Sequence, residues 1–426
     1  MAHWKQYQLG DCLTLMSGGT PSKARNDYWD GDIPWISCKD MKAERIHGAQ
    51  DYLTPLGAQN GTRVVPANTI VFVVRGMILA REFPVAMTKR VVAFNQDLKA
   101  AKPAHFIDNE FLFQWLRANT YEILGRVDEA GHGTTRIQTD RLLSLPISVP
   151  PLSIQRRIAR ILSAYDDLIE NNQRRIRILE GMARSLYREW FAHFRYPGYE
   201  SIPLVESPLG KIPQGWEVKN IGDVAVTFRG RSYRSVDLAV EGGIPFLNLK
   251  CLDRDGGFRR SGLKRYIGDF KEAHLARKGD IVMAVTDMTQ ERRIIARAAL
   301  VPSLNSEFGV FSMDLVRIEP KGEMQKSFLY SFFRYSSFAD EVKQHANGAN
   351  VLHLSPERIT DFRFSVPPAD LMERFVRFVA PSLEQMDVLQ NQTTNLRCTR
   401  DLLLPRLMSG QIDVTTTETL IEEAIA

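Results

Sequence analysis

Apolar residues in this chain gather in short runs and in helix-spaced stripes, and both patterns occur in each half of the sequence. Runs rich in β-branched residues, bounded by glycine, proline and asparagine, predict strands at residues 69–74, 85–94, 280–285 and 310–318. Apolar residues three or four positions apart predict amphipathic helices at residues 109–124 and 326–344. Each half is therefore expected to contain a domain of the α/β (α+β) class.

Two much longer helices are expected after the double prolines at residues 150–151 and 367–368, because proline is tolerated in the first turn of a helix. The first is predicted to run to about residue 194 and the second to end at Pro405. Their apolar seams have coiled-coil spacing, and Asn171 and Asn172 interrupt the first. The predicted seam residues are Ile154, Ile158, Ile161, Tyr165, Leu168, Asn172, Ile176, Leu179, Met182 and Leu186 in the first helix, and Leu371, Phe375, Phe378, Leu383, Met386, Leu389 and Leu396 in the second.

The sequence contains itself twice. Residues 94–151 align without a gap on residues 311–368 at a shift of 217, and both segments end in Ser-Val-Pro-Pro. Further upstream the shift is 211 to 212, so that Lys39 corresponds to Lys250. A period this long indicates two copies of one domain rather than a solenoid, whose repeats are about 20 to 50 residues long. We expect pseudo-twofold symmetry, with the two long helices joining the domains as an antiparallel coiled coil.

The predicted boundaries follow from these patterns and from a connector rich in proline and glycine. They are residues 1–150 for the first α/β domain, 151–195 for the central long helix, 196–215 for the connector, 216–367 for the second α/β domain, 368–410 for the C-terminal long helix and 411–426 for the tail.

Composition is that of a globular protein, with 44% hydrophobic and 25% charged residues among 426. The longest apolar runs are of strand length, so no membrane span is expected, and the N-terminus lacks the apolar core of a signal peptide. Four scattered cysteines without a C-x-x-C pair are typical of reduced thiols in the cytoplasm. The net charge of +5 favours polyanionic partners.

Several motifs stand in a fixed order along the chain. They are S-G-G-T-P-S-K at residues 17–23, Y-W-D-G-D-I-P-W-I-S at 28–37, F-V-V-R-G at 72–76, N-Q-D-L at 95–98, S-P-L-G-K-I-P-Q-G-W at 207–216 and L-L-L-P-R-L-M-S-G at 402–410. Their order, spacing and duplication resemble the specificity subunit of type I restriction-modification systems. That family alternates two target-recognition domains with two long helical conserved regions. The resemblance covers essentially the whole chain and implies that residues 1–150 and 216–367 are the target-recognition domains.

The second domain departs from the family pattern. R-G-R at residues 229–231 stands where the first domain has S-G-G-T-P, and T-D at 286–287 replaces R-G at 75–76. We therefore expect the two domains to recognise different targets.

Motifs of a catalytic centre do not occur in the sequence. It has neither the Asn/Asp-Pro-Pro-aromatic motif of an amino-methyltransferase nor the G-x-x-x-x-G-K-[ST] frame of a P-loop. Asp314, Glu319 and Lys321 could be read as a nuclease carboxylate cluster, but a salt bridge at a strand end is the plainer interpretation. The histidines show no H-x-x-x-H spacing for zinc. We expect a non-catalytic chain without a metal site or cofactor of its own.

Side chains suited to DNA are spread over the predicted loops. Arginine pairs with guanine and asparagine or glutamine with adenine, while lysine, serine and threonine hold phosphates. The candidates in the first domain are Thr20, Lys23, Arg25, Lys39, Arg75, Arg81, Lys89, Arg90, Thr134, Thr135 and Arg136. Those in the second are Arg229, Arg231, Tyr233, Arg234, Asn248, Lys250, Arg254, Arg259, Arg260, Arg292, Arg293, Asn347 and Asn350. A solvated surface charge is the alternative for each charged candidate.

Other prominent residues have plainer interpretations. Trp29 and Trp35 are expected to anchor core or loop rather than to stack on bases. The arginines of the first long helix either form a solvated face or meet partner subunits or phosphate; they are Arg156, Arg157, Arg160, Arg174, Arg175 and Arg177.

The sequence thus predicts a non-catalytic DNA-recognition subunit that reads a bipartite, asymmetric site on double-stranded DNA. The resemblance implies assembly with two modification subunits, which carry S-adenosylmethionine and methylate adenine at N6, and with translocating restriction subunits for cleavage. The alternatives are a coiled-coil scaffold, an orphan DNA-binding protein without an associated restriction activity, and a stand-alone nuclease or methyltransferase.

Overall fold

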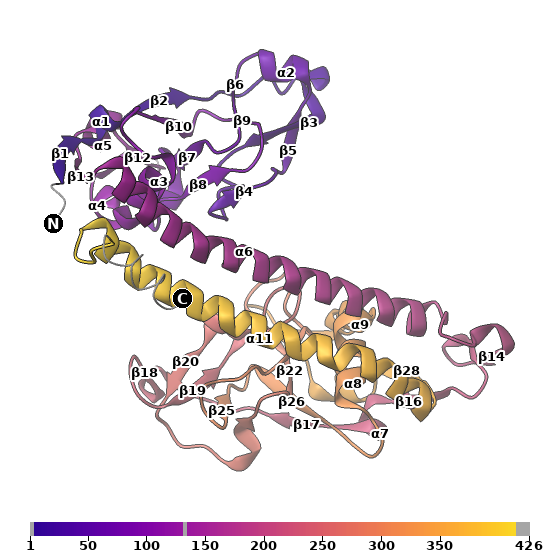
Figure 1. Ribbon diagram of the computed structural model, residues 1–426. Helices are drawn as coiled ribbons and strands as arrows, with labels where there is room; N and C mark the ends of the chain where they lie inside the picture. Colours follow the sequence, from indigo (N-terminus) through magenta and orange to yellow (C-terminus); the bar gives the residue numbers. More distant parts are fainter. Residues whose placement is uncertain (1–3, 131–133, 415–426) are drawn as a thin grey trace, which may run out of the picture. The chain divides into compact units, whose positions relative to one another are not determined.

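The structure, a computed structural model, describes residues 4–130 and 134–414 (Figure 1). The chain forms two compact units, of which the first comprises Met1–Glu170 with Asn395–Ala426 and the second comprises Asn171–Thr394. Both boundaries fall inside the long helices. Each unit therefore contains one α/β domain together with a stretch of both helices.

The α/β part of the first unit is built on a larger and a smaller sheet. The larger has the strand order β2 (Leu13–Ser17), β10 (Leu98–Pro103), β7 (Ile70–Val73), β8 (Val85–Thr88) and β4 (Arg45–Ile46). The smaller has the order β5 (Asp51–Leu53), β3 (Trp29–Ile36), β9 (Val92–Phe94) and β6 (Arg63–Val65). All four residues of β7 are buried, as expected of a central strand covered on both faces.

Helix α3 (Asn109–Ala118) packs against β8 and β10 and is fixed at its N-terminus. The carboxylate of Asp108 accepts a hydrogen bond from Phe111 N at 3.1 Å, which satisfies a free amide of the first turn. The buried side chain of Gln155 accepts a bond from Asp108 N at 2.8 Å and donates to Phe106 O and Pro150 O. Since Gln155 belongs to the first long helix, these bonds join the domain to that helix.

The second unit repeats this plan. One sheet has the order β17 (Ala225–Arg229), β26 (Leu315–Pro320), β22 (Ile281–Ala284) and β24 (Ala298–Leu300). The other has the order β18 (Leu238–Ala239), β20 (Lys264–Tyr266), β19 (Ile244–Leu247), β25 (Gly309–Phe311) and β21 (Leu275–Ala276). Helix α8 (Lys326–Tyr335) is the counterpart of α3.

The strand register confirms the internal duplication. Equivalent contacts recur in both units at the shifts seen in the sequence. They are Leu98 with Val73 and Leu315 with Ala284, Lys5 with Val149 and Glu217 with Val366, and the Asp108 amide with Gln155 and the Gln325 amide with Met372 Sδ. Two unlike sequences therefore fold on one scaffold.

Two predicted strands and both predicted short helices are interrupted. Residues 85–94 form β8 and β9, which lie in different sheets, and residues 310–318 likewise divide between β25 and β26. At the second break, Ser312 O accepts a bond from Leu315 N at 3.0 Å, so the chain turns sharply. Residues 109–124 divide into α3 and α4 (Thr120–Leu124), and residues 326–344 into α8, α9 (Phe338–Val342) and a 3-10 turn.

The long helices are α6 (Leu152–Tyr187), which continues as a π-helical turn at Arg188–Ala192, and α11 (Ala369–Met408). Both begin directly after the double prolines, as predicted. The prediction that Pro405 ends the second helix is wrong, because α11 continues to Met408. Gly410 follows with a φ of 73°, a conformation common just beyond helix ends.

The two helices run antiparallel. In the first unit, Ile158 and Leu162 of α6 share a core with Leu404 and Leu407 of α11. In the second unit, residues near the end of α6 share a core with residues near the start of α11: Ala183, Tyr187 and Trp190 with Leu371, Phe375 and Val379. The predicted pairing is confirmed by these contacts.

Part of the predicted seam is out of phase. Leu168, Met182 and Phe378 are 50%, 60% and 64% exposed. In each case the next residue is buried instead, namely Ile169, Ala183 and Val379. An α-helix has 3.6 residues per turn, so a seam drawn at a strict heptad spacing drifts by about 20° per heptad.

A buried ionic cluster joins the first domain to both helices. Asp166 of α6 lies 2.9 Å from Arg117 of α3 and 2.7 Å from Arg400 of α11, and only 4% of its side chain is exposed. Gln114 donates a third hydrogen bond to this carboxylate, and Arg400 also pairs with Glu44 at 2.8 Å. Burial alone would raise the pKa of Asp166, but the nearby guanidinium groups and hydrogen bonds bring it below its usual value.

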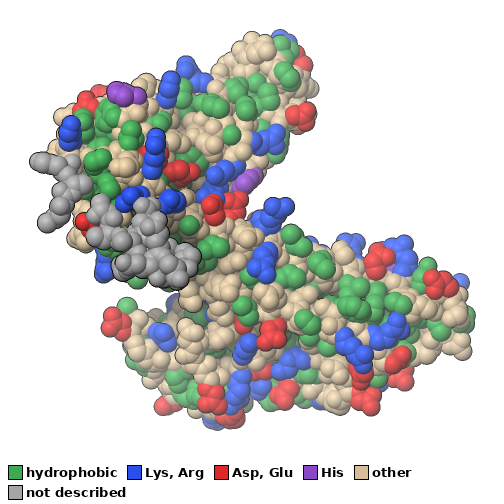
Figure 2. Space-filling view, viewed as in Figure 1, with side chains coloured by type: hydrophobic (Ala, Val, Ile, Leu, Met, Phe, Trp, Pro, Cys, Tyr) green, Lys and Arg blue, Asp and Glu red, His purple; other side chains and the backbone are tan. Residues whose placement is uncertain are grey.

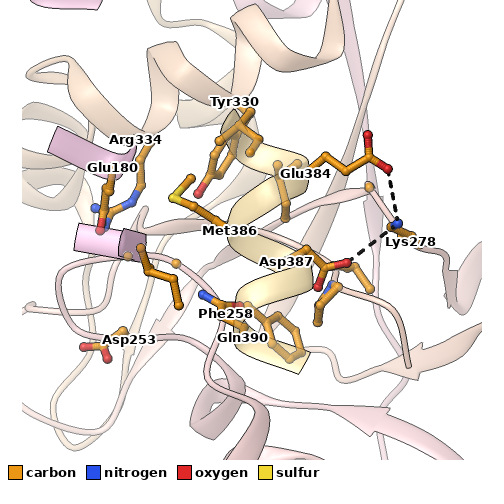
Figure 3. A pocket seen from close by; sticks show the side chains of 18 of the residues that line it. Glu180, Asp253, Phe258, Lys278, Tyr330, Arg334, Glu384, Met386, Asp387 and Gln390 are labelled. Carbon is orange, nitrogen blue, oxygen red and sulfur yellow. Dashed lines mark hydrogen bonds and ion pairs between the residues drawn. The ribbon is translucent and has the colours of Figure 1, made fainter. Parts of the chain in front are cut away.

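The second domain is joined to its helices around a cavity of about 360 Å³ (Figure 3). Arg334, the counterpart of Arg117, pairs with Glu180 of α6. Lys278 lies 3.7 Å from Asp387 and 3.9 Å from Glu384, both on α11. Because these charged groups line the cavity and each pair links the domain to a long helix, we interpret the cavity as part of the joint between domain and helices.

Candidate nucleic-acid interface

Backbone hydrogen bonds bring separate segments of the first unit together at the end of β7. Asp97 O accepts bonds from Val74 N at 2.8 Å and Arg75 N at 3.3 Å. Arg75 also forms an isolated antiparallel bridge with Arg136 of strand β12 (Thr134–Ile137). The next residue, Gly76, donates its backbone N–H to Thr135 O of the same strand at 3.0 Å. These bonds place the ends of three segments side by side.

We define the first reading face by five exposed residues carried on these segments: Lys39, Arg75, Met77, Gln96 and Arg136. Lys39 is included because its neighbour Cys38 lies against Arg75, with the thiol 3.5 Å from Arg75 O. Gly76 makes the turn possible, since its φ of 140° is a conformation that other residues rarely adopt.

The second unit repeats the arrangement. Val285 N donates to Asp314 O at 2.9 Å, and strands β23 (Thr286–Asp287) and β27 (Leu352–His353) pair as Thr286 with His353 and Asp287 with Leu352. We define the second reading face by the equivalent five residues: Lys250, Thr286, Met288, Met313 and His353. All are exposed except Thr286, which is buried and whose hydroxyl lies 3.4 Å from His353 Nδ1.

Asp287 organises the loop that follows β23. Its carboxylate accepts bonds from Thr289 N at 2.8 Å, Thr289 Oγ1 at 2.9 Å and Ile294 N at 3.1 Å. This aspartate occupies the position of Gly76 in the first unit, so the two units shape the same loop differently.

Six of the candidates predicted in the first domain divide between two places. Lys39, Arg75 and Arg136 belong to the first reading face, and Arg81 directly follows the 3-10 turn Met77–Ala80 beside it. Lys89 and Arg90 lie at the opposite end of the β7–β8 hairpin, because Ile70 pairs with Met87 and Phe72 with Val85. The structure therefore does not bring these two residues to the face.

The remaining candidates of the first domain lie on the β2–β3 loop or in β12. Thr20 donates to Gln96 Oε1 at 2.6 Å, Lys23 is exposed, and Arg25 pairs with Asp27 at 2.6 Å. Thr135 is buried and its hydroxyl donates to Gly76 O, so it shapes the turn. The side chain of Thr134 lies outside the described residues.

In the second domain, the segment after β17 reaches the second reading face. Arg231 N donates to Phe311 O at 2.8 Å, and Arg231 O accepts a bond from Met313 N at 2.9 Å. Arg229 is exposed, and the side chain of Arg234 is 82% exposed. Tyr233 packs edge-on against Phe246, and burial together with Asp314 raises its pKa.

Two predicted contacts of the second domain are corrected. Asn248 is 5% exposed and uses its side chain to bond Lys250 N and Gly262 O, so it is a structural cap. Arg260 is committed to the helix joint, where it pairs with Asp387 at 2.7 Å and donates to Ser303 O at 2.6 Å. Burial lowers the pKa of Arg260 in spite of the nearby carboxylate.

The other candidates of the second domain are exposed or half-buried. Arg254 and Arg259 belong to a segment tied to β24 through Gly257 N and Ala298 O at 2.9 Å. The rest lie on segments next to β23 and β27: Arg292, Arg293, Asn347 and Asn350. Asn347 pairs with His353 through its backbone, and Gln290 Nε2 donates to Ala349 O at 2.9 Å.

Sequence reasoning missed four of the ten face residues as contacts: Met77, Met288, Met313 and His353. It also gave Gln96 and Thr286 only as parts of motifs, so six of the ten were not predicted as contacts. The available signal was the repeat itself, because Met77 and Met288 are related by the same shift of 211 as Lys39 and Lys250.

Charge alone does not mark the interface. Figure 2 shows Lys and Arg side chains interspersed with Asp and Glu over the visible face of the molecule. The interface therefore has to be defined from the strand ends rather than from a basic stripe.

The tryptophans and the acidic cluster have structural roles. Trp35 Nε1 donates to Gly19 O at 3.0 Å and Trp29 Nε1 to Ser22 O at 3.1 Å, so both anchor the β2–β3 loop as predicted. Glu319 forms an ion pair at the strand end, with Arg317 at 3.3 Å rather than with Lys321 of the predicted cluster, which donates to Gly222 O at 2.8 Å. Over residues 4–130 and 134–414, no group of three or more His, Cys, Asp or Glu side chains could hold a metal ion.

Duplicated α/β domains on antiparallel helices, each with a polar face at the strand ends, define the class of protein. A family model described as the type I restriction modification DNA specificity domain matches residues 1–180 and 213–393. The chain belongs to this family. It is accordingly a non-catalytic specificity subunit that recognises DNA sequence within complexes of other subunits and DNA.

Named relatives agree with this membership. The chain is 26% identical to the type I restriction enzyme MjaIX specificity subunit of Methanocaldococcus jannaschii, over 96% of this chain and 94% of that protein. It is 34% identical to the EcoR124I/EcoR124II specificity subunit of Escherichia coli, over 43% of this chain and 44% of that protein.

The fold is also that of a solved structure. The crystal structure of the S subunit of a type I restriction-modification system from M. genitalium matches with a TM-score of 0.63, at 14% identity, over 95% of this chain and 96% of that one. None of the helices in the described part of the chain has the length and apolarity needed to cross a bilayer.

Proposed function

We propose that each unit reads one half of a bipartite, asymmetric DNA site through its reading face. The observation that carries the proposal is one scaffold with two sets of side chains. The bridge formed by Arg75 and Arg136 in the first unit is formed by Thr286 and His353 in the second. Side chains with different donors and acceptors select different base edges, so the two half-sites differ.

On the first reading face, Arg75 and Arg136 are the guanine readers. Both are exposed, and a guanidinium can fork onto O6 and N7 of one guanine. Gln96, whose amide is oriented by the hydroxyl of Thr20, suits adenine. Lys39 supplies a point charge for a phosphate, which fixes register without reading sequence.

On the second reading face, His353 and the flanking Arg231 and Arg234 are the readers. His353 is exposed at the end of β27, and Arg231 is tied to Met313 through its backbone. Lys250 takes the phosphate role of Lys39. This half-site is read with fewer guanidinium groups on the face itself and with more from the neighbouring loop.

The partners follow from the function. The protein works in the cytoplasm with two modification subunits, which bind S-adenosylmethionine and methylate adenine at N6, and with translocating restriction subunits for cleavage. A pure scaffold is the competing role, and it requires no sequence preference in either half-site.

The test is selection of duplexes from a random library by the complex of this chain with its modification subunits. Arg75→Ala should relax one base position in one half-site and weaken binding there by about 1–3 kcal/mol. Arg90→Ala is the matched control, because this arginine of the same domain lies at the far end of the β7–β8 hairpin. Unchanged selection by Arg75→Ala, or an equal effect of both variants, would contradict the proposed face.

A further inference from the structure

Each reading face carries an exposed methionine at the same place. Met77 and Met288 are both 74% exposed. Backbone pairing establishes their equivalence, since each follows the residue that pairs across to the next segment, Gly76 with Thr135 and Asp287 with Leu352. The shift between the two methionines, 211, is that of the surrounding sequence.

The local backbone conformation differs around the two methionines, so a shared loop conformation does not explain why methionine occurs at both positions. Met77 begins a 3-10 turn, Met77–Ala80, that follows a glycine with positive φ. Met288 lies in the loop capped by the Asp287 carboxylate, where the next residues are Thr289 and Gln290 rather than Ile78 and Leu79. Single exposed apolar residues are common on protein surfaces. Here the same side chain is presented at the same point by two differently built loops.

The surroundings of both methionines indicate what they contact. Polar face residues match the donors and acceptors of guanine and adenine, but none of them matches an apolar group. The thymine C5-methyl is an apolar group displayed on base edges in the major groove. A flexible, polarizable thioether adapts to such a group from more than one backbone geometry.

We propose that Met77 and Met288 are specificity-determining residues, each of which packs on the C5-methyl of a thymine in its own half-site. The inference rests on the proposed function, because it requires both faces to enter the major groove. Removing either the methyl group or the thioether should then weaken binding about fourfold, the factor that corresponds to burial of one methylene-sized group.

The experiment uses the complex with modification subunits and its selected duplex. Each thymine of the two half-sites is replaced singly by uracil, which removes the methyl and keeps the hydrogen-bonding edge. Wild type should lose about fourfold at one position in each half-site. Met77→Ala should bind the thymine duplex about fourfold more weakly and lose nothing further with uracil in the first half-site. Met288→Ala should do the same in the second half-site only, so each variant is the control for the other.

Several results would overturn the inference. The first is that the Met77→Ala complex binds the thymine duplex as tightly as wild type does. The second is that this variant still loses the full factor in affinity when uracil replaces thymine. The third is that a selected half-site contains no thymine. A Met77→Leu variant that retains the uracil penalty would support apolar contact, and an unchanged thermal melting curve excludes misfolding as the cause. Arg75→Ala separates the two levels: if it still relaxes the first half-site while the methionine variants have no effect, the proposed function stands and only this inference fails.

Discussion

The first and second reading faces lie at the ends of equivalent strands, and equivalent backbone hydrogen bonds hold each face together within its own unit. Yet only a lysine and a methionine are common to the two faces. The pairs that differ are Arg75 and Thr286, Gln96 and Met313, and Arg136 and His353. The shared residues suit contacts that every half-site offers, a phosphate and an apolar base edge. Of the differing residues, the two arginines, Gln96 and His353 suit hydrogen bonds to particular bases. The duplication thus keeps the scaffold and varies the specificity.

The joints between domains and helices also differ between the two units. The shift of 217 relates Asp166 to Leu383 and Arg400 to Ala183. All four residues are buried, so at these two positions the first joint is ionic and the second is apolar. An antiparallel pair built from two copies of α6 would place Ala183 opposite Asp166, and the buried carboxylate would lack its ion pair with Arg400. The ionic joint therefore favours pairing of α6 with α11.

The largest expected effect comes from breaking this ionic joint. Asp166→Leu leaves Arg117 and Arg400 without their shared buried carboxylate, and removing one partner of a buried pair costs about 3–5 kcal/mol of unfolding free energy. Denaturant unfolding gives the loss, and hydrogen exchange should localise it to the first unit.

The double variant Asp166→Leu with Arg400→Ala gives the first joint the two apolar residues that the second unit has at these positions. It should recover part of the lost stability, because Arg400 is no longer left buried without Asp166 and Arg117 keeps its ion pair with Glu44. A double variant no more stable than the single one would show that the two joints are not interchangeable.

Converting the first reading face into the second is the next largest change. Arg75→Thr with Arg136→His gives the first unit the bridge residues of the second. We expect loss of about 1–3 kcal/mol for each guanine contact at the first half-site, with the second half-site unchanged. Selection from a random library measures both at once. A change in the second half-site would contradict independent reading by the two units.

Local features of the fold could be predicted from sequence, because they depend on neighbouring residues and on the repeat. The buried strand β7, the helix start after Pro151 and the anchoring of Trp35 are of this kind. The end of α11 was predicted too early, since tertiary packing of Leu404 and Leu407 against α6 holds the helix through Pro405.

The candidate site was predicted less well, because a surface charge and a joint charge look alike in a sequence. Arg260 meets its partner Asp387 only through the fold, 127 positions away. Met77 carries no charge and no hydrogen-bonding group suited to a base or phosphate, so sequence rules for DNA contacts do not select it. The internal repeat relates Met77 to Met288, but the strand pairing is needed to show that the two loops are equivalent.

A smaller effect is expected on the stability of the first unit at acidic pH. The pKa of Asp166 in the folded chain lies below its usual value, so its stabilising contribution is complete above the unfolded pKa of about 3.9 and is lost as the pH falls from there through the folded value. Calorimetry between neutral pH and pH 3 should therefore show the wild type losing stability faster than the double variant in acid. The second unit has Leu383 in place of Asp166, and leucine does not titrate. The loss of stability in acid should therefore be confined to the first unit. Parallel curves for the two proteins would contradict the assignment.

The smallest expected effect is the one that the two faces share. Lys39→Ala and Lys250→Ala should each weaken binding to every duplex by the same factor, because a phosphate contact carries no sequence information. Each should also reduce the slope of log K against log salt by about 0.9, the value for one phosphate. Binding isotherms of the complex at several salt concentrations, on selected and on random duplexes, measure both quantities. Equal changes for the two lysines would place them at equivalent phosphates of the two half-sites. A loss confined to selected duplexes would instead make the lysine a base reader and would end the division of each face into shared anchors and varied readers.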